Sequence, residues 1–155
     1  MPQYCVYTVG HGSEDWDSFA RRLGGFNIEI LLDVRTYPYV ESSWFNRDRL
    51  EGNSRKKGWE YLWLGGKLGP LTEEGRVDYL SKEREKRYQD GIVELMNIAA
   101  ERNVCLLSSQ LDPMDSHRHH LIAQTLMRHD IGVLHILHDG ELQPAQADLF
   151  HGLPG

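Results

Sequence analysis

The sequence has little cysteine and no long hydrophobic run. Its two cysteines, Cys5 and Cys105, both lie within apolar stretches of a 155-residue chain, so they do not form a disulfide framework and are typical of small buried side chains in a reducing compartment. No apolar run approaches the roughly 20 residues of a membrane-spanning helix. The N-terminus also lacks the basic-then-apolar pattern of a secretory signal. We therefore expect a cytoplasmic protein that does not associate with membranes.

Positive charge is also scarce. The chain carries 17 basic and 23 acidic residues, with a formal net charge of −6. A domain that binds duplex DNA usually presents a basic face, so general duplex DNA binding is not expected. Neither internal repeats nor low-complexity segments are present. The length predicts one domain, which we place at residues 1–143, followed by a loose C-terminal tail over residues 144–155.

Short apolar runs alternate with segments of helical periodicity. The strands are expected at residues 4–9, 28–34, 60–64, 104–107 and 131–137. Helices are expected at residues 14–23, 73–89, 91–102 and 116–129, the first of them capped by Ser13. Residues 35–59 are expected to be a long irregular stretch. This order predicts a single-domain α/β fold, a mostly parallel open sheet flanked by helices, Rossmann-like or flavodoxin-like.

Polar residues follow several of the expected strands directly. In open α/β sheets, ligands bind beyond the carboxyl ends of the strands, so the side chains that follow each strand are the candidates for a shared pocket. The candidates are His11, Asp33, Arg35, Ser108, Gln110, Ser116, His117 and Arg118.

The types of these residues indicate roles. Asp33 and Arg35 are two residues apart, so they point to the same side of an extended chain and can pair. Either Asp33 orients a substrate or a base while Arg35 binds an anion bidentately, or the ion pair only ties down the following loop. Arg118, in the first turn of a helix, would bind an anion together with backbone N–H groups. His117 is a candidate acid or base or merely a polar residue, and Ser116 either caps the helix or supplies a hydroxyl group.

A second candidate region combines aromatic and basic residues. Residues 47–67 contain six basic residues against three acidic ones, with Trp59, Tyr61 and Trp63 among them and Trp44 just before. Nucleic-acid bases stack on such rings and basic groups contact phosphates. The alternative is that some rings belong to the core and the basic run lies in a solvated turn. As ligand-binding candidates we take Trp44, Phe45, Asn46, Trp63 and Lys67.

Patterns for metals and cofactors are missing. The further histidines, at positions 119, 120, 129, 135, 138 and 151, show neither H-E-x-x-H spacing nor cysteine partners at zinc-finger spacing. Around Gly65-Gly66-Lys67 the rest of a phosphate-binding P-loop is lacking, which predicts a turn. No dinucleotide fingerprint or cofactor lysine is evident. We expect no metal and no cofactor.

Several motifs occur in a characteristic order: Val9-Gly10-His11, Asp33-Val34-Arg35, Phe45-Asn46, Leu64-Gly65-Gly66, residues 106–110 (LLSSQ), Ser116-His117-Arg118 and Leu134-His135-Ile136. In these motifs the chain resembles, over nearly its whole length, the domain of unknown function family numbered 488, whose name states no activity. The resemblance implies cysteine at the positions of Ser108 and Ser116 and glutamate at that of Gln110, whereas His117 and Arg118 match. If the family's chemistry uses a thiolate, this chain lacks its nucleophile.

Three hypotheses follow. The first is an enzyme-type domain that binds a nucleotide or nucleic-acid base, with phosphate or another anion on Arg35 and Arg118, His11 and His117 as acid and base, and hydrolytic or group-transfer chemistry. The second is a catalytically silent binding module with the same pocket, in nucleic-acid modification or defence. The third, from a weaker similarity to the rhodanese layout, is a sulfur carrier that lacks its thiol at Ser108. An exposed edge strand or the tryptophan-rich segment would suit a homodimer.

Overall fold

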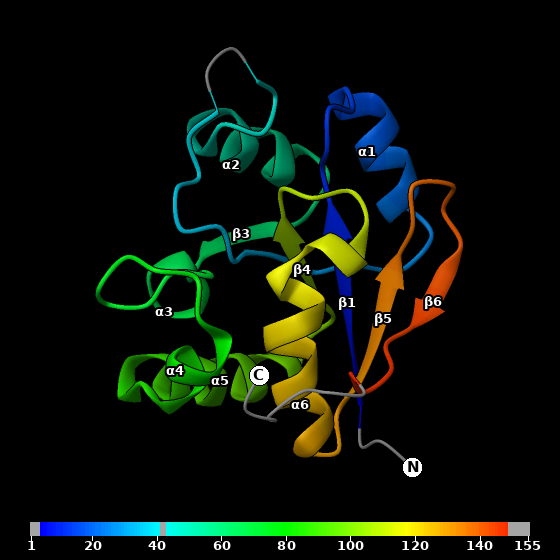
Figure 1. The fold of residues 1–155 in the computed structure, drawn as a ribbon. Helices are drawn as coiled ribbons and strands as arrows, with labels where there is room; N and C mark the ends of the chain where they lie inside the picture. The colour runs from blue at the N-terminus through cyan, green and yellow to red at the C-terminus, as the bar shows by residue number, and fades with distance from the viewer. Residues whose placement is uncertain (1–3, 41–42, 149–155) are drawn as a thin grey trace.

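A computed structural model describes residues 4–40 and 43–148. Its centre is a six-stranded sheet with the order β3-β2-β4-β1-β5-β6 (Figure 1). The strands are β1 (Cys5–Gly10), β2 (Ile30–Asp33), β3 (Glu60–Trp63), β4 (Val104–Ser108), β5 (Gly132–Ile136) and β6 (Leu142–Pro144). All neighbouring pairs are parallel except β5 with β6. The mostly parallel α/β fold is therefore confirmed, although this strand order differs from the orders 3-2-1-4-5-6 and 2-1-3-4-5 of Rossmann and flavodoxin folds.

Helices cover both faces of the sheet. Two lie on one face: α1 (Trp16–Leu23) and α2 (Arg47–Lys56). The opposite face carries α5 (Lys86–Ala99), the π-helix η2 (Arg118–Ala123) and its continuation α6 (Gln124–Arg128). Shorter helices are α3 (Gly65–Leu68), α4 (Tyr79–Arg84) and the 3-10 turn η1 (Pro113–Asp115). Among the described residues, no helix is long and apolar enough to cross a membrane.

Burial on both faces explains the apolar strands. In β4, Val104 and Leu106 pack with α5 and η2, whereas Cys105 and Leu107 pack with α1 and α2. Successive side chains of a strand point to opposite faces, so a strand covered on both sides is apolar at every position. This continuous apolar character is what made the strands visible in the sequence.

Several helix predictions were wrong. The expected irregular stretch contains α2, which the side chain of Asn46 caps through a bond to the backbone of Asp48. The helix expected at residues 73–89 is instead a turn closed by the Leu71–Val77 bridge, then α4, then the start of α5. The helix expected at residues 91–102 corresponds to α5, which begins at Lys86, five residues earlier than expected. The physical reason is that mostly polar segments carry little periodic apolar signal.

Three further expectations can be compared with the structure. The cap of α1 is the side chain of Asp15, which accepts from Ser18, and not that of Ser13. The expected turn at Gly65-Gly66-Lys67 is the short helix α3. The helix expected at residues 116–129 is confirmed as one continuous helical segment, of which η2 is the π-helical first part and α6 the second.

The expected C-terminal tail is partly structured. β6 pairs with β5, and the Ala145 N–H donates to the Val133 carbonyl. Further along, the Asp148 N–H donates to the side chain of Gln124 on α6. This segment therefore packs against the sheet and α6, whereas the rest of the expected tail, residues 149–155, lies outside the described residues.

Candidate functional site

The adjacent strands β1 and β4 are followed by helices on opposite faces of the sheet, which makes a topological switch point between them. The chain leaves β1 through α1 on one face of the sheet and leaves β4 through η2 and α6 on the other. Ligands of open α/β sheets bind at such switch points, beyond the carboxyl ends of the strands. Here Gly10 is paired in register with Ser108, and the His11 N–H donates to the Ser108 carbonyl at 3.1 Å.

Gly10 allows the loop after β4 to lie across this position. A Cβ atom on Gly10 would be 1.7 Å from the carbonyl oxygen of Gln110 and 3.0 Å from Nη1 of Arg118. No side chain fits there, so the backbone of the loop closes over the end of β1. Two polar clusters flank this closure, one on each face of the sheet.

The first, the Asp33 cluster, consists of Asp33, Arg35, Tyr61 and His11. Arg35 donates Nε and Nη2 to the two oxygens of the Asp33 carboxylate, at 2.8 and 2.7 Å. Asp33 also accepts from the Arg35 N–H and, at 2.6 Å, from the Tyr61 hydroxyl. Asp33 and Arg35 are buried. The carboxylate is thus saturated with donors, which suits an anchor for the guanidinium better than a proton acceptor.

His11 extends this cluster as a neutral ring. Its Nε2 lies 3.2 Å from Nη1 of Arg35, which can only donate, so the proton of the neutral ring is on Nδ1, 2.8 Å from the Gly12 carbonyl. Burial lowers the pKa of His11, with the Arg35 charge acting in the same direction and the Gly12 and Asp33 contacts opposing. The ring stacks on Phe45, with centroids 4.6 Å apart. Both nitrogens of His11 are therefore engaged.

The second, the Arg118 cluster, surrounds a fully buried guanidinium. Arg118 donates to the hydroxyls of Thr8 and Ser108 and to the carbonyls of Gln110 and Leu111, at 2.6–3.2 Å. These acceptors are all neutral, and no carboxylate among the described residues forms an ion pair with Arg118. Burial lowers its pKa to about 10, so the side chain is charged at neutral pH.

Ser108 and Ser116 belong to the same cluster. The Ser116 hydroxyl donates to the Ser108 oxygen at 2.9 Å and accepts from the Arg118 N–H at 3.1 Å. Ser108 therefore accepts two hydrogen bonds, one of them from a charged donor. Ser116 caps the first turn of η2 in this way, which is the structural role that the sequence indicated.

His117 lies between the two clusters. Its Nε2 is 3.0 Å from the carbonyl of Val34, the residue that follows β2, so it donates to that carbonyl. Burial lowers its pKa to about 4. The ring is neutral and connects the start of η2 to β2.

The candidates are thus divided between the faces of the sheet. Side chains two residues apart in a strand lie on the same face. Asp33 therefore shares the face of Leu31, which packs with α1 and α2. Thr8 and Ser108 share the opposite face with Val6 and Leu106, which pack on the α5 side. The structure therefore brings together His11, Asp33 and Arg35, and separately Ser108, Ser116 and Arg118. Gln110 joins the second group only through its carbonyl, since its side chain is exposed.

The aromatic and basic candidates are scattered. Phe45 is buried and Asn46 caps α2. Trp63 Nε1 donates to the Arg35 carbonyl at 2.8 Å. Lys67 forms an ion pair with Glu94 on α5 at 2.9 Å. Trp44 stays 43% exposed, with the Arg49 guanidinium 4.5 Å from its ring centroid.

Two exposed rings were missed. Tyr37 and Tyr39, which follow β2, are 73% and 61% exposed. The sequence signal was available: two aromatic residues flank Pro38 just after a strand end, where a ligand site is expected.

The family model described as "Domain of unknown function DUF488" matches residues 15–125, more than two-thirds of the chain. The chain belongs to the DUF488 family. Comparisons with curated proteins and with solved structures each find no match. The part matched to DUF488 contains Asp33, Arg35, Ser108 and Arg118, whereas His11 precedes it.

Neither cysteine of this DUF488 chain lies at the carboxyl edge. Cys5 is exposed at the amino end of β1. Cys105 is buried in the core, and burial raises its pKa to about 12. A thiolate nucleophile is therefore not provided at this edge by the chain's own cysteines.

Proposed function

We propose that this DUF488 domain binds a small phosphorylated ligand of the nucleotide class at the carboxyl edge of the sheet, with the phosphate on Arg118. The observation that carries the proposal is a fully buried guanidinium held by neutral acceptors and by no carboxylate ion pair among the described residues. An isolated charge is costly to bury. A bound anion would provide the missing negative charge.

Access requires the loop after β4 to move. The Gln110 and Leu111 carbonyls accept from Arg118, and both of these residues are exposed. A phosphate oxygen is a stronger acceptor than a carbonyl, so the ligand would replace these two bonds. Thr8 and Ser108 would keep the guanidinium in place. Arg35, whose charge Asp33 already balances, would position the neighbouring His11 and face the ligand from the other side of the switch point.

The base of such a ligand would stack on exposed aromatic residues. Tyr37, Tyr39 and Trp44 all belong to the connection between β2 and α2 and are exposed to 43% or more. Stacking of a base on an aromatic ring is worth roughly 1–3 kcal/mol. Exposed rings at the carboxyl end of a parallel strand fit this use.

The same contacts favour binding over catalysis. A general base needs a free lone pair near its substrate. His11 has both ring nitrogens engaged, by Arg35 and by the Gly12 carbonyl, and Asp33 accepts four hydrogen bonds. His117 donates its Nε2 proton to the Val34 carbonyl and is buried, so its ring does not face a solvent-accessible substrate. We therefore favour the binding module over hydrolytic or group-transfer chemistry, and a sulfur carrier least, since a thiol is missing at Ser108.

Titration calorimetry with nucleoside monophosphates and the matching nucleosides tests the proposal. We expect monophosphates to bind and nucleosides to bind more weakly. Trp44→Ala should weaken binding roughly tenfold, from the ~1–3 kcal/mol of stacking, whereas Val93→Ala, an exposed residue on α5, should not. Arg118→Lys keeps the charge but loses the geometry, and should also weaken binding. If the wild type binds no nucleotide at millimolar concentration, the proposal is wrong.

A further inference from the structure

Two histidines and one aspartate converge at the C-terminal segment. His119 Nε2 lies 3.0 Å from one oxygen of Asp148, and His120 Nδ1 lies 2.6 Å from the other. One ligand atom from each of the three residues lies within 4.8 Å of the other two. His119 is buried, and the other two are half-buried. The three residues come from two segments that are far apart in the sequence but held together by the bond from the Asp148 N–H to Gln124.

The outer nitrogen of His120 decides what its inner nitrogen can do. Its Nε2 lies 2.7 Å from the Met114 carbonyl, which can only accept, so Nε2 carries a proton. In a neutral ring, Nδ1 then presents a lone pair to the Asp148 carboxylate, which is also an acceptor. A cation between these two acceptors would satisfy both.

A second imidazole contacts the outer nitrogen of His119 and so orients its ring. Its Nδ1 is 2.9 Å from Nε2 of His135, whose Nδ1 is 2.6 Å from the Thr8 hydroxyl. His135 and Thr8 are both fully buried. Histidines that ligate metals generally donate their second ring N–H in a hydrogen bond, which fixes the ring. For His119 to ligate through Nε2, its Nδ1 carries the proton and donates to His135 Nε2, and His135 Nδ1 donates in turn to the Thr8 oxygen. Both histidines of the group therefore have a supporting partner on the outer nitrogen and direct the inner nitrogen at Asp148.

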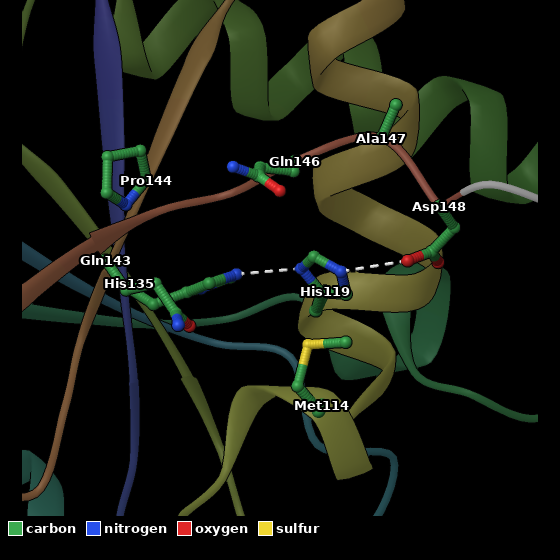
Figure 2. A pocket seen from close by; sticks show the side chains of 8 residues that line it. All are labelled: Met114, His119, His135, Gln143, Pro144, Gln146, Ala147 and Asp148. Carbon is green, nitrogen blue, oxygen red and sulfur yellow. Dashed lines mark hydrogen bonds and ion pairs between the residues drawn. The ribbon is translucent and has the colours of Figure 1, made fainter.

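A cavity of about 430 Å³ opens beside the group. His119 and Asp148 line it together with Met114, His135, Gln143 and Gln146. Figure 2 shows His119 between His135 and Asp148, with the imidazole directed at the carboxylate. An ion held here would have space for further ligands from solvent, as in metal sites that keep an open position.

We propose that His119, His120 and Asp148 form a binding site for a divalent first-row transition ion such as Zn²⁺, with open coordination positions facing this cavity. Two imidazole nitrogens and one carboxylate oxygen are ligands that Zn²⁺ takes, whereas Mg²⁺ and Ca²⁺ prefer oxygen ligands throughout. The proposed ligands are other side chains than those of the proposed nucleotide site, and the proposal does not rest on that site.

The test uses the full chain, stripped of metal with a chelator. Titration calorimetry with Zn²⁺ is expected to show one site with a dissociation constant in the micromolar range or below, and Mg²⁺ is expected not to bind. Co²⁺ should give visible absorption bands of a nitrogen- and oxygen-ligated ion. Zn²⁺ should also raise the melting temperature of the wild type, because it binds the folded state.

Variants locate the ion. Asp148→Asn and His120→Ala are each expected to weaken Zn²⁺ binding by at least about tenfold and to reduce the Co²⁺ bands. His129→Ala and His138→Ala remove exposed imidazoles elsewhere and are the matched controls. Circular dichroism of each variant checks that the fold is kept. The proposal is overturned if the wild type binds no Zn²⁺, or if the control variants lose as much affinity as the cluster variants; the group is then an imidazolium–carboxylate pair that only fastens the C-terminal segment.

Discussion

At the scale of single residues, the buried carboxylate of Asp33 depends on the donors around it. The Tyr61 hydroxyl donates to it at 2.6 Å, and burial raises the pKa of Tyr61, so this hydroxyl keeps its proton. Tyr61→Phe is expected to lower the free energy of unfolding by about 1.5–3 kcal/mol, the range for hydrogen bonds to charged groups. Urea denaturation measures this.

Tyr4→Phe is the matched control for Tyr61→Phe. The Tyr4 hydroxyl donates to the neutral carbonyl of Met96 at 3.0 Å, so the expected loss is only about 0.5–1.5 kcal/mol. Equal losses in the two variants would contradict a special role for the charged acceptor.

His11 makes stability depend on pH. Because burial lowers its pKa from the usual value of 6.5 in the folded state, the unfolded chain takes up a proton at higher pH than the folded chain does. Stability contributed by the neutral ring is therefore complete above pH 6.5 and is lost as pH falls toward the folded-state pKa, by at most about 1.4 kcal/mol per pH unit. The free energy of unfolding can be measured by urea denaturation at several pH values between 7.5 and 5. We expect it to fall less steeply with decreasing pH in His11→Gln than in the wild type. An unchanged slope would show that His11 is not the group involved.

At the scale of elements, two glycines within helices are expected to respond oppositely to alanine. A Cβ on Gly52 in α2 would meet no atom within 4 Å, whereas one on Gly91 in α5 would lie 2.8 Å from Cβ of Lys67 and 2.9 Å from Leu68. Alanine in a helix interior is favoured by roughly 0.5–1 kcal/mol over glycine. Gly52→Ala should therefore raise the melting temperature.

Gly91→Ala should lower the melting temperature, because overpacking costs typically about 1–3 kcal/mol and exceeds the gain in propensity. Thermal unfolding of the two variants, monitored by circular dichroism, makes the comparison. A higher melting temperature for both variants would contradict this, because it would mean that α3, which carries Lys67 and Leu68, moves away from α5 at little cost.

The elements differed in how well the sequence predicted them. Strands buried on both faces, such as β4, are apolar throughout and were recognisable. The polar helices α2 and α4 were not, because their order comes from capping by Asn46 and Asp78 and from tertiary contacts. The short strand β6 has an exposed pattern that carries no period.

At the scale of the whole molecule, the sequence predicted the edge of the sheet at which the candidate residues lie better than it predicted their arrangement there. Strand ends indicated the right edge of the sheet for Asp33, Ser108 and His11. Which face each side chain takes depends on strand order and register, and these are long-range properties that local pattern does not contain. The cluster of His119, His120 and Asp148 was hidden for the same reason, since Asp148 lies 28 residues after His120 in the sequence.

The sheet is expected to open from one side. β1 and β4 are its central strands, whereas β6 is a short, exposed edge strand that, among the described strands, pairs only with β5. Local opening needs the least free energy where few buried contacts hold a segment. Native-state hydrogen exchange should show the slowest amides in β1 and β4 and faster exchange in β6. Equal protection across all these strands would contradict this order.

The wide turn of η2 links the two proposed binding activities. A π-helix contains an extra residue relative to an α-helical turn, and here it carries Arg118 toward the strand ends and His119 toward the C-terminal segment. A one-residue deletion in this turn would restore ordinary helical phase and rotate one of these side chains away from its partners.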